Sequence, residues 1–289
     1  MSSVRNDALI SAVHVASTGS AAQHKEHRNG SRLPSLVWAL TSQSWIKVPI
    51  NVYVFVHRDG LVLFDTGLDA AIGTNPGYVS NPIVRFFLHR LFRLRIGPGE
   101  TLGAGLKALG YAARDIRKAI ISHLHFDHVG GIGEIPNAEL LVSADEWRTL
   151  SAPHPERKFV FCEHIELPGA RWRQIEFSPT DDPLFAPFGG RHDVMGDGSM
   201  VLLPTPGHTP GSVSMLVRAN NWPPLLFVGD LTYEEALLMN DQPPGTGDPA
   251  QLRSSFAKVR GLKARLPEMM ILPTHDNSAA DTLATLTLP

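Results

Sequence analysis

The chain has 289 residues, and its 26 Lys and Arg against 28 Asp and Glu give a formal net charge of −2. This balance excludes the basic surface of a nucleic-acid-binding protein. The single cysteine, Cys162, excludes an intrachain disulfide framework and a cysteine-rich zinc site. The sequence has no apolar run of membrane-spanning length, and its first 19 residues lack the pattern of a secretory signal. We therefore expect a cytoplasmic protein with no membrane or nucleic-acid partner.

The chain begins with a predicted short strand over residues 10–15 and a solvated loop over residues 19–32. We interpret His24 and His27 in this loop as exposed side chains. Residues 1–35 are therefore expected to form an N-terminal strand and loop. Next, residues 51–56 and 61–64 are rich in β-branched and aromatic side chains on either side of an Asp-Gly turn, which predicts a β-hairpin.

The hairpin's second strand ends at Asp65-Thr66-Gly67. Asp65 is either a turn residue or a group that orients a metal ligand, and we favour the second role.

Residues 83–96 combine apolar and arginine side chains, and the apolar ones recur at helical spacing. We interpret this segment as an amphipathic helix packed on the body or against a second subunit. In the alternative interpretation, Phe86, Phe87 and Phe92 wall an apolar substrate pocket. A second helix is expected over residues 100–109, with Gly110 after its end, so residues 76–110 form a helical insertion near the substrate pocket or a dimer interface.

The most informative stretch follows the apolar run 119–121. It contains three histidines and a carboxylate within six residues: His123, His125, Asp127 and His128. Such a polar cluster beside a core is costly unless it is paired, and imidazole and carboxylate are ligands that suit zinc and related divalent ions. The alternate spacing presents ligands in two directions, which suits two metals better than one.

The middle of the chain is less regular. Residues 140–142 predict a strand, and Ser143 with Glu146 predicts a capping box for the helix that follows. Residues 159–162 resemble a buried strand, with Cys162 as a small core residue. The rest of residues 151–198 has little periodicity, and its histidines are interpreted as surface residues.

Three further strands, over residues 200–203, 225–229 and 269–272, each end near a histidine or aspartate, namely His208, Asp230 and His275. Residues 213–217 predict another strand and residues 250–266 an amphipathic helix. Because open sheets place their sites at strand ends, these groups are candidates for one site. No linker divides the sequence, so we expect a single domain over residues 1–289.

Five segments, in this order, resemble the metallo-β-lactamase superfamily: Asp65-Thr66-Gly67, His123-x-His125-x-Asp127-His128, Pro206-Gly207-His208-Thr209-Pro210-Gly211, Gly229-Asp230 and His275. The resemblance implies an α/β fold, an αββα four-layer sandwich with the metals at one edge of its two sheets. It further implies that His123, His125 and His208 hold one metal, that Asp127, His128 and His275 hold a second, and that Asp230 bridges them.

Within the superfamily the sequence is most similar to the quorum-quenching N-acyl homoserine lactonases. The true β-lactamases lack the bridging carboxylate, and glyoxalase II carries a C-terminal helical domain for which few residues remain after His275. The lactonases have a tyrosine three residues after the bridging aspartate, which here is Tyr233.

The resemblance therefore implies a dinuclear-metal hydrolase that opens the ester ring of a lactone, with N-acyl homoserine lactones as the first choice, by attack of a metal-bridging hydroxide. Zn2+ is the expected ion, with Mn, Fe or Co as alternatives. Tyr233 would hydrogen-bond the developing oxyanion, Asp127 would relay a proton, and Asp230 would keep the ions close. We expect a homodimer whose only other partner is the small-molecule substrate.

Three alternatives remain open. The first is a hydrolase of the same fold that acts on another lactone or ester, a thioester, a phosphotriester or a β-lactam. The second is a metal-binding module without activity, although structural zinc sites usually have closed ligand shells. The third is a di-iron protein that handles oxygen or electrons.

Overall fold

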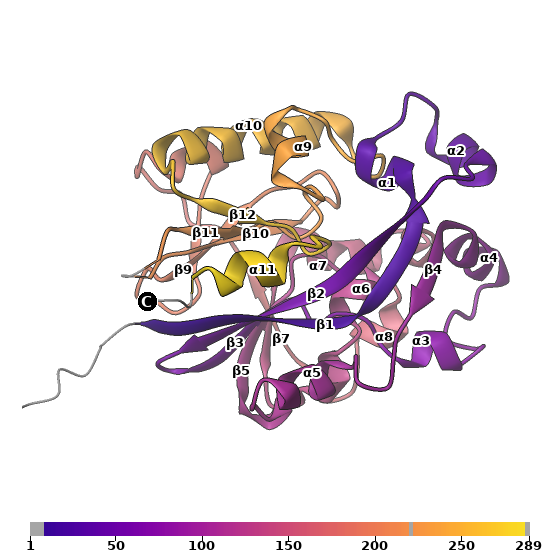
Figure 1. Ribbon diagram of the computed structural model, residues 1–289, viewed down its shortest axis with the longest axis horizontal. Coiled ribbons are helices and arrows are strands. Elements are labelled where there is room, and N and C mark those ends of the chain that lie inside the picture. The colour runs from indigo at the N-terminus through magenta and orange to yellow at the C-terminus, as the bar shows by residue number, and fades with distance from the viewer. Residues whose placement is uncertain (1–8, 220–221, 287–289) are drawn as a thin grey trace, which may run out of the picture.

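The computed structural model of the chain describes residues 9–219 and 222–286 (Figure 1). The first eight residues of the expected N-terminal strand and loop therefore lie outside the described residues. Two sheets pack face to face. The larger has the strand order β4-β1-β2-β3-β5-β6-β7 and the smaller the order β12-β11-β10-β9-β8.

The strands of the larger sheet are β1 (Ile10–His24), β2 (Trp45–His57), β3 (Gly60–Phe64), β4 (Phe92–Arg95), β5 (Ile116–Ile120), β6 (Glu139–Ser143) and β7 (Arg171–Ile175). Those of the smaller sheet are β8 (His192–Asp193), β9 (Met200–Pro204), β10 (Val213–Val217), β11 (Leu225–Phe227) and β12 (Met270–Leu272).

The α-helices are α1 (Lys25–Asn29), α2 (Ser35–Thr41), α3 (Ala71–Thr74), α4 (Pro82–Leu91), α5 (Leu102–Ala108), α6 (Phe126–Val129), α7 (Ala144–Trp147), α8 (Cys162–Ile165), α9 (Glu235–Met239), α10 (Pro249–Arg265) and α11 (Ala279–Ala284). Short 3₁₀ turns are η1 (Ala113–Asp115), η2 (Ile132–Glu134), η3 (Arg148–Ser151), η4 (Pro155–Lys158) and η5 (Ala186–Phe188).

The alternation of side chains along each strand builds the layers. In β2, Tyr53 and Phe55 face the core between the sheets, whereas Val52 and Val54 face the outer helices of the larger sheet. Strand β9 divides its side chains in the same way between the central core and the layer that contains α10. Successive strand residues point to opposite faces, so each sheet carries a core on both sides. Figure 1 shows α9 and α10 outside the smaller sheet and α5 outside the larger one. This arrangement confirms the predicted α/β four-layer sandwich.

Strand β1 is longer than the sequence predicted. It continues through residues 16–24 and pairs with both β2 and β4. The prediction of a solvated loop over residues 19–32 is therefore wrong, because this stretch supplies a strand and helix α1. His24 is fully buried and His27 is 3% exposed, so the interpretation of both as surface side chains is also wrong.

Two other local predictions need correction. The expected helix over residues 83–96 ends at Leu91, after which Phe92–Arg95 forms strand β4 on the edge of the larger sheet. The expected strand over residues 159–162 is absent, since Phe159–Phe161 is irregular and Cys162 begins α8 as a partly exposed residue. The predicted hairpin and the strands over residues 200–203, 213–217, 225–229 and 269–272 are confirmed within a few residues.

The topology brings several loops to one edge of the sandwich. Strands β3 and β5 are parallel neighbours in one sheet, and β11 and β12 are parallel neighbours in the other, so the loops that follow each pair leave on the same side. The two sheets are joined at this edge where the Val213 N–H donates to the Ser122 carbonyl at 3.0 Å. None of the helices in the described ranges has the length and apolar character needed to cross a membrane.

Candidate metal centre

The residues expected as ligands converge at this edge. The nitrogen and oxygen atoms of three groups lie within 4.8 Å of one another inside each group. The groups are His123, His125 and His208; Asp127, His128 and His275; and His123, His128 and Asp230. All seven side chains that the sequence singled out therefore meet in one place, and together they are the donor cluster.

Asp230 occupies the middle of the donor cluster. Its Oδ1 lies 3.3 Å from His128 Nε2 and 3.2 Å from His275 Nε2, and its Oδ2 lies 3.5 Å from His208 Nε2. His125 stands close to both other histidines of the first group, with its Nδ1 3.0 Å from the Nε2 atoms of His123 and His208. The carboxylate of Asp230 thus faces histidines of both groups.

Two buried atoms at the centre of the donor cluster have no hydrogen-bond partner among the residues that the structure describes. They are His128 Nε2 and Asp230 Oδ1, which face each other without hydrogen-bond geometry. An unsatisfied buried polar atom in a folded protein needs a physical explanation. Imidazole nitrogens and carboxylate oxygens are donors that bind divalent cations such as zinc. The residues therefore fit a bound divalent metal.

The protonation states of the first group suit metal binding. Burial lowers the pKa of His123 well below its usual value, that of His125 to about 4 and that of His208 to about 3. These imidazoles are consequently neutral near pH 7. A neutral imidazole keeps a lone pair for a metal ion.

The second group carries the opposite electrostatic signature. Burial lowers the pKa of His128, but the carboxylates of Asp230 and Asp65 outweigh it and hold this pKa well above the usual value. Burial likewise lowers the pKa of His275, and Asp230 raises it by more. Burial raises the pKa of Asp230, yet His275 and His128 bring it well below the ordinary range. The negative charge around Asp230 therefore attracts positive charge to this position.

Asp65 orients His128. The Asp65 side chain is fully buried, and its Oδ2 accepts a 2.8 Å hydrogen bond from His128 Nδ1. The Ser122 N–H donates to Asp65 Oδ1 at 2.7 Å, which fixes the carboxylate against the start of the histidine loop. Because Nδ1 carries the proton, Nε2 of His128 is left to face Asp230, a common arrangement for metal-binding histidines. Asp65 therefore has the hydrogen bond to His128 that the predicted orienting role requires.

Glu146 is a buried residue of the site that the sequence did not reveal. Its Oε1 accepts from the Leu124 N–H at 2.9 Å, and its Oε2 accepts from the Thr209 hydroxyl at 2.6 Å and the Gly211 N–H at 3.0 Å. It therefore connects the loop of His123 and His125 to the loop of His208. Gly211 packs so closely on the Glu146 backbone that a Cβ would overlap it.

The predicted capping box is only half formed as a result. The Ser143 hydroxyl accepts from the Glu146 N–H at 3.0 Å, as expected of an N-cap. The Glu146 carboxylate, however, binds the two ligand loops. The S-x-x-E pattern has an ordinary explanation as a cap, so no feature of the sequence separated the two roles.

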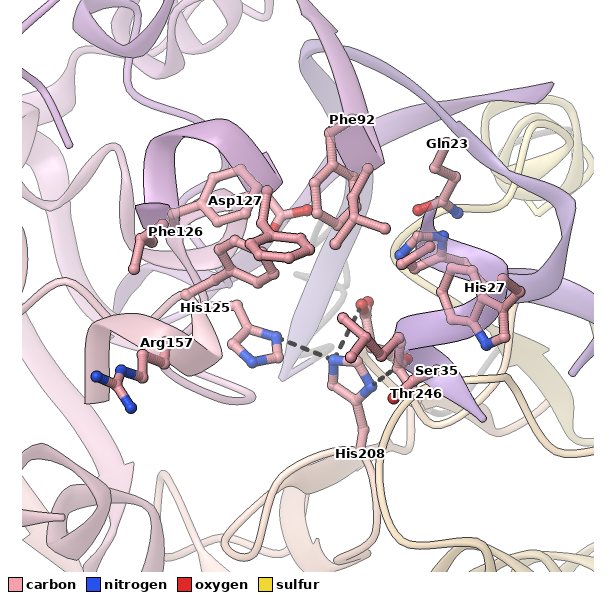
Figure 2. Close-up of a pocket in the computed structure, with 18 of the residues that line it drawn as sticks. Gln23, His27, Ser35, Phe92, His125, Phe126, Asp127, Arg157, His208 and Thr246 are labelled. Atoms are coloured by element: carbon pink, nitrogen blue, oxygen red, sulfur yellow. Dashed lines mark hydrogen bonds and ion pairs between the residues drawn. The ribbon is translucent and has the colours of Figure 1, made fainter. Parts of the chain in front are cut away.

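A cavity of about 640 Å³ opens above the donor cluster. Its base contains Asp127, Asp230 and His275, and Tyr233 lies beside them. The walls are mainly apolar. They come from α2, α4 and the start of β4, with one residue each from α6 and the segment after η4; they include Leu36, Trp38, Ile83, Phe87, Phe92, Phe126 and Phe159. Figure 2 shows His125 and Phe126 on one side of the cavity and Gln23 and His27 on the other.

Both interpretations of residues 83–96 hold in part. Phe87 and Phe92 line the cavity, as the pocket interpretation required, whereas Phe86 is 57% exposed and does not. The segment thus both packs on the body and forms a pocket wall.

Comparison with known proteins agrees with this geometry. The model of the family described as "Metallo-beta-lactamase superfamily" matches residues 45–275. The N-acyl homoserine lactonase AttM of Rhizobium radiobacter is 29% identical over 188 residues, which are 65% of this chain and 66% of AttM. The match thus spans slightly less than two thirds of that relative. A probable metallo-hydrolase of Mycobacterium tuberculosis is 30% identical over 251 residues, covering 78% of this chain and 74% of its own length.

Solved structures share the fold. An N-acyl homoserine lactone hydrolase bound to N-hexanoyl-L-homoserine superposes with a TM-score of 0.76 at 22% identity, over 94% of this chain and 96% of that one. A dizinc quorum-quenching lactonase, AidC, superposes with a TM-score of 0.63 at 20% identity, over 93% of this chain and 88% of AidC.

Proposed function

The chain belongs to the metallo-beta-lactamase superfamily, and from this premise we propose that it is a metal-dependent hydrolase that opens the ring of N-acyl homoserine lactones. The observation that carries the proposal is the position of the donor cluster at the base of a cavity with apolar walls. The cluster suits hydrolytic chemistry, and the walls suit an acyl chain. The lactonases among its relatives support this choice of substrate.

We assign the donors as two sets that hold two divalent ions, with Zn2+ as the first candidate. His123, His125 and His208 hold the first ion, and Asp127, His128 and His275 hold the second. Asp230 lies between the sets and joins them, which its contacts with His128, His275 and His208 support. Divalent ions in such a site supply activated water at neutral pH and polarise an ester carbonyl.

Tyr233 acts on the oxygen that becomes negative in the reaction. It is 4% exposed, lies against the cavity, and has a pKa that burial raises well above the ordinary value. The phenol is therefore protonated at neutral pH, so it donates a hydrogen bond. A fixed donor directed at a developing oxyanion stabilises the transition state.

Asp127 is the second catalytic candidate. Its Oδ2 lies 3.6 Å from the Nε2 of His275, another member of the second donor set, and Asp127 also lines the cavity. A carboxylate at this position accepts a proton and passes it to the leaving alkoxide. General acid–base catalysis of this kind requires the group to be within reach of the reacting oxygen.

The test combines metal analysis with a pH-stat assay, because ring opening of a lactone releases a proton at neutral pH. We expect about two divalent ions per chain, hydrolysis of N-acyl homoserine lactones, and loss of activity after chelation with recovery on adding zinc, manganese or cobalt. A panel with a thioester, a phosphotriester and a β-lactam covers the alternative reactions. Rapid turnover of one of these with inert lactones would refute the proposal.

We also propose that residues 1–289 form one cytoplasmic domain and that two copies form a homodimer. Side chains from both sheets share one central core, which supports a single domain. Six large apolar side chains on or beside α2 and α4 are more than 40% exposed, and we call them the apolar rim: Leu33, Leu36, Val37, Leu40, Ile83 and Phe86. Contiguous exposed apolar surface is typical of protein interfaces, and this supports the dimer.

A further inference from the structure

Gln23 is a buried polar residue in the wall of the cavity, and the proposed mechanism gives its side chain no role. It lies at the penultimate position of β1, is 2% exposed, and lines the cavity together with Tyr233. Its Nε2 has no hydrogen-bond partner among the described side chains and backbone. Figure 2 shows Gln23 and His27 across the cavity from Phe126 and His125.

The position of Gln23 is rigid. In the sheet it pairs with Ile46 of β2 on one side and Phe92 of β4 on the other. Its surroundings in the cavity include the rings of Trp38 and Phe92. A buried donor that lacks a partner lowers stability by an amount comparable to a whole hydrogen bond. An apolar residue of the same length would avoid this loss, so the carboxamide is not explained by folding.

We propose that the Gln23 carboxamide is a specificity-determining group that hydrogen-bonds the secondary amide of an acyl-amide lactone. This inference rests on the proposed function, whose substrate class it narrows. A carboxamide offers both an N–H donor and a carbonyl acceptor, and a secondary amide offers the same pair. An unsubstituted alkyl chain offers neither, so Gln23 favours amide-bearing lactones over alkyl lactones of equal length.

A competing role for Gln23 is to position Tyr233. Burial raises the pKa of Tyr233, and hydrogen bonding from the Gln23 side chain lowers it, so the carboxamide lies beside the phenol, although its Nε2 has no partner of full hydrogen-bond geometry among the described residues. A residue that only positions Tyr233 would affect every lactone equally, because Tyr233 acts at the ring. The two roles therefore differ in their substrate dependence.

The experiment compares N-octanoyl-L-homoserine lactone with α-nonyl-γ-butyrolactone, in which methylenes replace the amide. The variant Gln23→Met keeps the length of the side chain and removes its hydrogen bonds. In the metal-loaded protein we expect kcat/KM for the amide substrate to fall about fivefold or more, as expected for one lost hydrogen bond. The value for the alkyl lactone should be unchanged. Gln174→Met, an exposed position on β7, is the matched control and should alter neither value.

The Tm of Gln23→Met is a second measurement. If Gln23 mainly supported the fold, this Tm would be lower than that of the wild type. The Tm of Gln23→Met without substrate should equal or exceed that of the wild type, because an unpaired buried donor is removed. An equal loss of kcat/KM on both lactones, or a lower Tm with no change in selectivity, would overturn the inference.

The outcome for Gln23 can be separated from that of the proposed function. If the wild type opens neither lactone, the proposed hydrolysis is wrong. The role of Gln23 is then tested by ligand binding, measured as a shift in Tm. In that case a rise in Tm with N-octanoyl-L-homoserine, present in the wild type and lost in Gln23→Met, would retain amide recognition. Equal shifts in the two proteins, or none in either, would reject it.

Discussion

The phenol ring of Tyr233 stacks on the imidazole of His275, with ring centroids 5.5 Å apart and planes within 18° of each other. This contact fixes the tyrosine, which also lines the cavity, against a proposed metal ligand. The stacking depends on the ring and the proposed catalysis on the hydroxyl, so the two contributions can be separated.

Tyr233→Phe keeps the stacked ring and removes the donor. We expect metal content and Tm close to those of the wild type and a kcat lowered by roughly 10²–10³-fold, the usual effect of removing one oxyanion donor. Steady-state kinetics with metal analysis on the same preparation checks this. Wild-type turnover in the Phe variant would mean that Tyr233 is only a packed aromatic.

Asp230→Asn tests the carboxylate between the two donor sets. The amide is similar in size but carries no charge, and Asp230 is the group that faces His128 and His275. We expect metal occupancy and activity to fall together, with metal affinity lower by about tenfold or more, because even the loss of a group that supports a ligand costs roughly 10–100-fold. Competition with a chromogenic chelator measures the affinity. An Asn variant with wild-type occupancy and affinity would show that the charge of Asp230 is not needed to bind metal.

The sequence predicted that His123, Asp230 and His275 would meet because each comes shortly after a strongly apolar run. The runs before His123, Asp230 and His275 are confirmed strands, and parallel neighbours necessarily end at one edge. The position of the site could therefore be predicted from the strands and their common sheet edge, without accurate prediction of the helices.

The sequence failed where tertiary contacts override local pattern. The part of β1 over residues 16–24 is rich in Ser, Gly and Ala, which have weak strand preference, and it is a strand because β2 and β4 hydrogen-bond to it on both sides. His24 is buried because the Trp45 ring packs 4.1 Å from its own. In contrast, the alternation in Phe92–Arg95 was a readable strand signal, obscured by the helix before it.

Glu146→Gln tests the connection between the two ligand loops. All three groups that reach the Glu146 carboxylate are donors, from Leu124, Thr209 and Gly211. The glutamine amide nitrogen would therefore meet a donor, which costs roughly 1–3 kcal/mol. We expect a lower Tm and faster loss of metal to a chelator.

The matched control for that variant is Glu139→Gln on β6. Glu139 pairs with Lys118 at 2.6 Å and is partly exposed, so its loss should change stability little. Equal behaviour of the two variants would indicate that Glu146 has no special role in holding the loops.

The proposed dimer predicts that polar substitutions on the apolar rim release monomers. Val37, Leu40 and Phe86 belong to the rim but do not line the cavity, so the triple serine variant leaves the pocket intact. Light scattering after gel filtration should give one chain mass for the variant and two for the wild type. Met239→Ser, an exposed apolar position on α9, is the control and should remain dimeric. A wild-type protein that elutes as a monomer at micromolar concentration would contradict the proposal.

His27 predicts a specific dependence of stability on pH. Burial lowers its pKa from 6.5 to about 3, and its ring is enclosed by Trp38 and Phe92. Between pH 6.5 and pH 3, His27 is therefore protonated in the unfolded chain and neutral in the native protein. The contribution of neutral His27 to the free energy of unfolding is complete above pH 6.5 and is lost as the pH falls toward 3. Between pH 7.5 and pH 5 the loss should be about 2 kcal/mol.

His27→Asn does not titrate and keeps an N–H donor for the His24 carbonyl, which His27 Nδ1 now reaches at 3.2 Å. Urea unfolding of both proteins across this range isolates the contribution of His27, because other titrating groups are common to the two; parallel stability curves would show that His27 takes up its proton in the native protein.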